Sequence, residues 1–308
     1  MSLKAAIFHR SVKLEESQLE PPDPRCQFCG SIDRYNVHIL QETPLVTLQK
    51  CNNCYAISAS RLPTEQMLIE YYSNYYNDSI SDFSNGNITF DNPKRLTKYL
   101  ADNFTLYNSK SSISILDFGG GDGTISHLLA LQLLDRGLHN VWITVVDFCK
   151  NPISVVDRRI EIEMVDSLGN INRQYEFVLA SAVIEHNPTP GALISELLKR
   201  LNQGGIFYSR TPCIFPIIRL FKTINVSIDF TYPGHLHDLG QKFWGNLFID
   251  NQSQKFQVLV SKPSIVETTF NKHFVRTLIA YICKAPWYIL GKYYKYVGGW
   301  EILVKRRN

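Results

Sequence analysis

The chain alternates short apolar runs, typical of buried strands, with longer stretches whose apolar residues have helical spacing. The clearest junction is 113–123, where an apolar strand reaches Asp117 and runs directly into four glycines within five positions. Apolar residues then return at positions 125, 128, 129 and 133, and Gly137 is a natural C-terminal stop for this helix. The pattern therefore predicts a strand, a glycine loop and a helix in succession.

The same reading predicts further strands and helices on both sides of this junction. Strands are predicted at 141–147, 160–165, 175–181, 206–211, 258–261 and 298–304. Helices are predicted at 63–76, from Pro93, from Thr189 to the glycine pair at 204–205, and at 270–284. This alternation predicts a doubly wound α/β sheet, in which ligands bind beyond the carboxyl ends of the strands.

The glycine loop does not fit a dinucleotide-binding fingerprint. Thr124 or Ser126 occupies the place of the third glycine, depending on where the count begins. Asp117 and Asp122 would also repel a phosphate at the start of the helix, whereas they would attract a ligand that carries a sulfonium and an ammonium. The charges therefore favour S-adenosylmethionine. An acid that ends the next strand, Asp147, is placed to accept both ribose hydroxyls.

Two motifs resemble class I S-adenosylmethionine-dependent methyltransferases. The first is Asp-x-Gly-x-Gly-x-Gly, made by Asp117, Gly119, Gly121 and Gly123, and the second is the strand at 175–181 followed by Glu185-His186. The second motif is similar to that of one large subgroup. The resemblance spans about residues 26–308 and implies a Rossmann-like sheet that binds S-adenosylmethionine. It also implies cofactor contacts from four further residues, which are Asp166, Ser167, Ser181 and Tyr75.

Cysteine spacing predicts a separate N-terminal module. Two Cys-x-x-Cys knuckles, Cys26/Cys29 and Cys51/Cys54, are separated by 21 residues, a spacing that lets four thiolates bind one zinc ion. Four ligands leave no open position, so the zinc is expected to be structural. Two disulfides or a redox pair are the weaker alternatives. We expect this zinc ribbon to have its own core and to unfold by itself when zinc is lost.

These motifs divide the chain into three predicted parts. Residues 1–62 form an arm and the zinc ribbon, residues 63–110 a helical segment that covers the cofactor, and residues 111–308 the methyltransferase domain. Insertions at 212–238 and 263–298 interrupt this domain, and they are predicted to be lids.

Methyl transfer requires alignment of the acceptor and removal of one proton, for which a histidine is the expected base. His186 lies just beyond the fourth strand, and His235 and His237 lie in the first insertion. We expect His186 to be the main catalytic residue, because a strand end is rigid whereas a lid must move.

Composition narrows the function further. The chain has 308 residues, 44% hydrophobic and 19% charged, with no long apolar run and no leader-like apolar block. These values predict a folded cytoplasmic protein without a membrane span. A net charge of +4 is a weak argument for nucleic acid, although basic residues outnumber acids nine to two between Lys262 and Asn308.

The predicted function is methyl transfer from S-adenosylmethionine to a small polar metabolite, such as a sugar, polysaccharide or natural-product intermediate. One alternative is an RNA base methyltransferase, because some relatives that modify rRNA also carry a zinc module. A second alternative is a non-catalytic scaffold whose ribbon binds a partner. The oligomeric state does not follow from the sequence.

Overall fold

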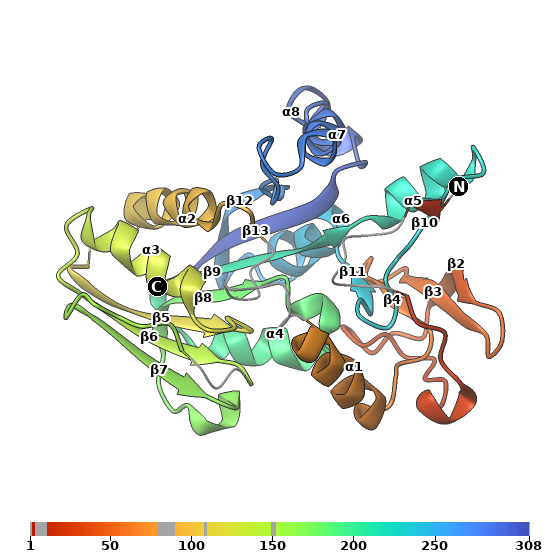
Figure 1. The fold of residues 1–308 in the computed structure, drawn as a ribbon, viewed down its shortest axis with the longest axis horizontal. Coiled ribbons are helices and arrows are strands. Elements are labelled where there is room, and N and C mark those ends of the chain that lie inside the picture. Colours follow the sequence, from red (N-terminus) through yellow and green to blue (C-terminus); the bar gives the residue numbers. More distant parts are fainter. Residues whose placement is uncertain (1, 4–10, 79–89, 108–109, 149–151, 308) are drawn as a thin grey trace.

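A mostly parallel sheet forms the centre of the molecule (Figure 1). The computed structural model describes residues 2–3, 11–78, 90–107, 110–148 and 152–307. Within them the large sheet has seven strands in the order β12-β13-β9-β8-β5-β6-β7. The strands are β5 (Ser112–Phe118), β6 (Asn140–Val146), β7 (Ile160–Val165), β8 (Tyr175–Ser181), β9 (Leu201–Cys213), β12 (Phe256–Pro263) and β13 (Gly298–Arg306). This sheet confirms the predicted doubly wound α/β class.

The direction of the strands fixes where the sheet can bind a ligand. Strands β5 to β9 are parallel, and β13 runs antiparallel between β9 and β12. The chain order reverses between β5 and β8, since β6 and β7 lie on one side of β5 while β8 and β9 lie on the other. Such a switch point opens a crevice at the carboxyl ends of the strands.

Helices cover both faces of this sheet (Figure 1). Helices α2 (Pro93–Tyr107) and α3 (Thr124–Leu134) pack on one face, and α4 (Pro190–Lys199) packs on the other. Helix α3 buries Leu129 and Leu133 of its predicted apolar face, together with Ala130 and Leu134, whereas Ile125 and Leu128 are half-buried. The other helices are α1 (Glu65–Asp78), α5 (Phe215–Lys222), α6 (Gln241–Gly245), α7 (Phe274–Lys284) and α8 (Trp287–Leu290).

Short helical turns and a strand pair complete the described elements. The 3-10 turns are η1 (Glu16–Gln18), η3 (Leu168–Asn170), η4 (Ile184–His186) and η6 (Gly291–Tyr293), and η5 (Asn246–Asp250) is a π-helical turn. Strands β1 (Ser2–Leu3) and β10 (Ser227–Ile228) pair in parallel. None of the described helices combines the length and the apolar character that a membrane span requires.

The zinc ribbon does not have the separate core that the sequence analysis expected. Its sheet contains β2 (Arg34–Gln41), β3 (Val46–Cys51), β4 (Ile57–Ala59) and β11 (His237–Asp238). Strand β11 comes from the first predicted lid and pairs antiparallel with β4. Three ribbon cysteines also belong to the same buried cluster as Trp244 and Trp300. The expectation is corrected because the insertion supplies both a strand and apolar side chains to the ribbon.

Candidate functional site

The glycine loop lies between the end of β5 and the start of α3. Gly119, Gly121 and Gly123 all have left-handed backbone, with φ of 69°, 59° and 85°. A side chain at Gly119 would clash, because an added Cβ would lie 2.6 Å from Cγ2 of Val183. At Gly121, by contrast, an added Cβ would meet no atom within 4 Å. The loop therefore keeps open space beside Gly121, where a ligand can approach the backbone closely.

Two acids support this loop from the strand ends. Asp147 follows β6, and its carboxylate accepts a hydrogen bond from the Gly121 amide at 2.8 Å. Asp117 is 2% exposed, and its Oδ2 has no hydrogen-bond partner among the described residues. Burial, with a smaller contribution from the nearby charge of Asp147, raises the pKa of Asp117 to about 7. A buried carboxyl with an unpaired oxygen fits a site that receives a cationic ligand.

Three of the remaining predicted cofactor residues lie at the same edge of the sheet. Asp166 and Ser167 follow β7 and are exposed, and Ser167 Oγ accepts a hydrogen bond from the Gly169 amide at 3.2 Å. Ser181 ends β8. Tyr75 belongs to α1, but its side chain lies outside the described residues.

The structure adds Arg210 and Glu267, which the sequence analysis did not select. Buried Arg210 on β9 donates from Nε to Ser181 Oγ at 2.8 Å, and it forms an ion pair with Glu267. Its guanidinium also lies 4.2 Å from the ring centroid of Phe90. Burial is the largest single influence and would raise the pKa of Glu267, but the charge and hydrogen bond of Arg210, together with the charges of Lys284 and Arg276, lower it overall. A lone arginine within an apolar strand was the available signal in the sequence.

Phe148 is another residue that the sequence analysis did not select. It directly follows Asp147 and is 81% exposed, which is unusual for a large aromatic side chain. It therefore offers an apolar surface next to the acid that is expected to bind ribose.

His186 and His235 lie together beyond β8. Their ring centroids are 4.9 Å apart. His186 Nδ1 is bonded to the carbonyl oxygen of Gly234, which can only accept, so Nδ1 carries the proton and Nε2 carries the lone pair. His235 Nδ1 is 2.6 Å from Thr231 Oγ1, and the Tyr72 hydroxyl donates to the Gly234 carbonyl at 3.3 Å. The hydrogen bonds hold both rings in fixed orientations.

Glu185 lies directly beside this histidine pair. It is 2% exposed, and burial raises its pKa to about 8. One ligand atom each from Glu185, His186 and His235 lie within 4.8 Å of one another. A divalent cation needs such atoms about 3 Å apart, so the group could hold one after a small closure.

His237 has a different environment from the other two histidines. It is fully buried, with Nδ1 2.9 Å from Ser58 Oγ and Nε2 2.9 Å from the Asn187 carbonyl oxygen. Burial lowers the pKa of His237 to about 4, so the ring stays neutral near pH 7. Both ring nitrogens are engaged within the protein, and this placement favours a structural role over the catalytic role considered from the sequence.

The four ribbon cysteines come together as their spacing predicts. The sulfurs of Cys26 and Cys54 are 3.6 Å apart, and those of Cys29 and Cys51 are 3.7 Å apart. Four thiolates around one zinc ion at about 2.3 Å have sulfur–sulfur separations of about 3.8 Å. The donor set and its dimensions therefore fit a tetrahedral zinc site.

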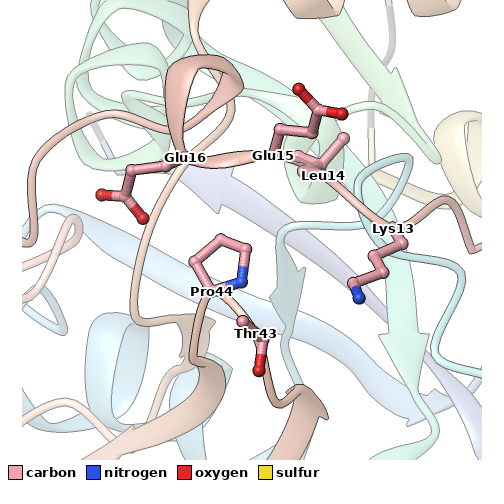
Figure 2. A pocket seen from close by; sticks show the side chains of 6 residues that line it. All are labelled: Lys13, Leu14, Glu15, Glu16, Thr43 and Pro44. Atoms are coloured by element: carbon pink, nitrogen blue, oxygen red, sulfur yellow. The ribbon is translucent and has the colours of Figure 1, made fainter.

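A pocket of about 380 Å³ lies between the N-terminal arm and the turn that precedes β3 (Figure 2). It is lined by Lys13, Leu14, Glu15, Glu16, Thr43 and Pro44. None of these is a candidate for cofactor, metal or catalysis, so we assign the pocket no role.

Comparison with known proteins identifies the family. The model of the methyltransferase domain matches residues 91–258, which include the glycine loop, both supporting acids and the histidine pair. No curated protein sequence matches the chain. The family assignment therefore rests on the domain match, which covers more than half of the length of this chain.

Solved structures with a similar fold are distant in sequence. The plantazolicin methyltransferase BpumL in complex with SAH is 14% identical, with coverage of 79% of this chain and 91% of that chain and a TM-score of 0.48. Magnesium protoporphyrin IX methyltransferase (ChlM) from Synechocystis PCC 6803 with bound SAH is 13% identical, with coverage of 80% and 100% and a TM-score of 0.48. The [4+2]-cyclase SpnF is 16% identical, with coverage of 70% and 80% and a TM-score of 0.42. By its domain match, the chain belongs to the methyltransferase family and is an S-adenosylmethionine-dependent methyltransferase.

Proposed function

We propose that this enzyme methylates a small polar metabolite, such as a sugar or a natural-product intermediate. The observation that carries the proposal is the enclosure of His186 by Tyr72, His235 and the Gly234 backbone. These groups bring aromatic rings and hydrogen-bonding atoms together beyond β8, a combination that suits a compact polar acceptor. The one arginine described at this strand edge, Arg210, is buried in an ion pair, so it does not offer a basic surface for RNA.

The cofactor supplies an electrophilic methyl group on a sulfonium. In this proposal the open backbone at Gly121 and the acids Asp117 and Asp147 hold it, with Asp147 at the ribose and Asp166 and Ser167 at the adenine. Ser181 and Tyr75 complete the expected contacts.

The role of His186 in this proposal is to remove the acceptor proton. Its Nδ1–H is fixed on Gly234, which leaves the Nε2 lone pair as the basic site. His235 positions the acceptor. His237 fixes β11 against the ribbon instead of reacting.

We also propose that Cys26, Cys29, Cys51 and Cys54 bind one structural zinc ion. The sulfur separations support this assignment, and so does the matching backbone of the two knuckles. In each knuckle an amide four residues after the first cysteine bonds back to that cysteine's carbonyl, from Gly30 at 2.8 Å and from Tyr55 at 3.1 Å. Both of these residues have positive φ. Two such turns present their thiols toward one point.

A methyl-transfer assay with labelled S-adenosylmethionine tests the function. The full chain is incubated with free sugars, nucleotide sugars and rRNA, and the labelled product is identified. Once an acceptor is found, His186→Ala should lower kcat by about 100- to 10,000-fold with little change in the affinity for S-adenosylhomocysteine. His235→Ala should mainly raise KM.

His139→Ala is the matched control, because this exposed histidine precedes β6 at the opposite edge of the sheet. It should leave both constants unchanged. Methylation of rRNA alone, or a near-normal kcat for His186→Ala, would contradict the proposal. Loss of activity on chelation without loss of fold would instead assign Glu185, His186 and His235 to a cation.

A further inference from the structure

The segment from α7 to η6, residues 274–293, presents its apolar side chains to solvent. We call it the α7–α8 hairpin. Figure 1 shows it standing above β12 and β13 at one side of the molecule. Its strongly exposed apolar residues are Phe274 (60%), Val275 (66%), Ile279 (55%), Ile282 (60%), Tyr288 (67%), Ile289 (88%) and Tyr293 (85%). Such a contiguous stretch on a folded protein marks a binding surface.

Helix α7 exposes the apolar side that a helix of a soluble domain ordinarily buries. Its buried residue is Thr277, whose hydroxyl donates to Thr268 Oγ1 at 2.8 Å. The bulky residues Phe274, Val275 and Ile282 face outward instead. A helix normally buries its apolar stripe in the protein core, so an exposed stripe of this kind points to a binding partner.

The hairpin is held firmly in this orientation by its inner side. Lys284 donates from Nζ to Ser264 Oγ at 3.0 Å, and the ring centroids of Trp287 and Trp300 are 5.7 Å apart. Arg95 on α2 donates to the Tyr281 hydroxyl at 3.2 Å. The outward face is therefore a fixed feature of the fold.

Charge determines which partner fits this face. The sequence contains no Asp or Glu from Thr268 to Val297, whereas Lys272, Arg276, Lys292 and Lys295 are exposed there. Two of the exposed lysines lie over tyrosine rings, with Nζ 5.6 Å from the Tyr293 centroid and 5.7 Å from the Tyr296 centroid. Apolar side chains bordered by lysine and tyrosine are typical of the interface of an anionic bilayer.

We propose that the α7–α8 hairpin binds the surface of an anionic lipid membrane, with its apolar residues in the acyl boundary and with Lys292 and the flanking Lys272 and Lys295 at the headgroups. The inference does not depend on the acceptor or on the role of His186. The segment that leads into α7 carries Glu267, which pairs with Arg210 beside Ser181, so membrane binding would place the strand-end site near the bilayer surface.

Vesicle co-sedimentation of the full chain tests the proposal. Wild type should bind phosphatidylglycerol-containing vesicles, bind pure phosphatidylcholine much more weakly, and lose binding as salt rises. Ile279→Ser/Ile282→Ser/Ile289→Ser should reduce binding about tenfold or more. Lys292→Gln/Lys295→Gln should reduce it about fivefold per lysine on anionic vesicles.

Ile249→Ser is the matched control, because Ile249 lies in η5 outside the hairpin and is 57% exposed, close to the 55% of Ile279. It should bind vesicles like wild type, and all variants should keep the wild-type circular dichroism and unfolding transition. Absence of wild-type binding to anionic vesicles would overturn the proposal. So would a wild-type dimer that the triple serine variant converts to monomer, since a second copy would then cover the hairpin.

Discussion

Replacing Gly121 by alanine tests two roles of this glycine separately, namely its left-handed backbone and the open space that it leaves for the cofactor. Gly121 has φ of 59°, and a Cβ there would meet no protein atom within 4 Å. Alanine should therefore cost only the left-handed strain, about 1 to 2 kcal/mol. In a chain of this size that corresponds to a fall in Tm of about 2 to 4 °C per kcal/mol.

The effect on the cofactor should be larger than the effect on the fold. If the cofactor occupies the open space at Gly121, the new methyl group overlaps it at a cost of about 1 to 3 kcal/mol, or roughly 5- to 150-fold in affinity. Calorimetry with S-adenosylhomocysteine measures the affinity, and thermal unfolding measures the strain.

Gly137→Ala provides the control at the other end of α3. Gly137 also has positive φ, 96°, and an added Cβ would meet no atom within 4 Å. It precedes the amino end of β6, so it lies away from the carboxyl ends of the strands where the cofactor is expected. It should show the same loss of Tm and unchanged affinity. Wild-type affinity in a folded Gly121→Ala variant would refute the placement of the cofactor beside this residue.

Three further predictions concern the acids and the metal. Asp147→Ala should weaken S-adenosylhomocysteine binding by roughly 10- to 100-fold, from the loss of charge-assisted hydrogen bonds of about 1.5 to 3 kcal/mol, whereas exposed Asp250→Ala should not. Metal analysis should find one zinc per chain. Chelation should unfold the ribbon and the large sheet in one transition, because they share a core. Protein without zinc, or two separate unfolding transitions, would count against this prediction. Because burial raises the pKa of Asp117 from 3.8 to about 7, the native state binds more protons than the unfolded state between these values. The unfolding free energy of the cofactor-free protein should therefore fall as pH rises through this window and level off above it, and Asp117→Asn should remove that component in denaturant titrations.

Local sequence patterns were sufficient to predict most strands of the parallel sheet. The strand predicted at 160–165 coincides with β7, and the glycine-loop helix begins and ends close to its predicted bounds. These elements have a strict apolar period and clear glycine or proline boundaries. Strand β9 was the exception. It begins at Leu201, before Gly204 and Gly205, and the register shift between Tyr175 and Phe177 on β8 accommodates the glycine pair within a continuous strand.

Long-range contacts could not be predicted in the same way. The spacing of Cys26, Cys29, Cys51 and Cys54 is local, and the structure brings these cysteines together. The pairing of β11 with β4 joins residues about 180 positions apart through a two-residue strand, which has no periodicity of its own. Arg210 and Glu267 likewise meet only in the folded chain. The different environments of His235 and His237 arise from such distant contacts, so the sequence alone could not distinguish their roles.

The shared core gives the ribbon a part in shaping the histidine site. The amide of Leu236 donates to the Glu185 carbonyl at 2.9 Å, and the carbonyl of Leu236 accepts from the Ala59 amide of β4 at 2.9 Å. Leu236 is thus held between the ribbon and the turn that carries His186. The two histidines beside Leu236 contact different parts of the protein. His235 lies against His186, and His237 bonds to Ser58 of the ribbon. Because one short segment makes both sets of contacts, we expect the ribbon to fix the position of His235 and the first insertion to form a wall of the site.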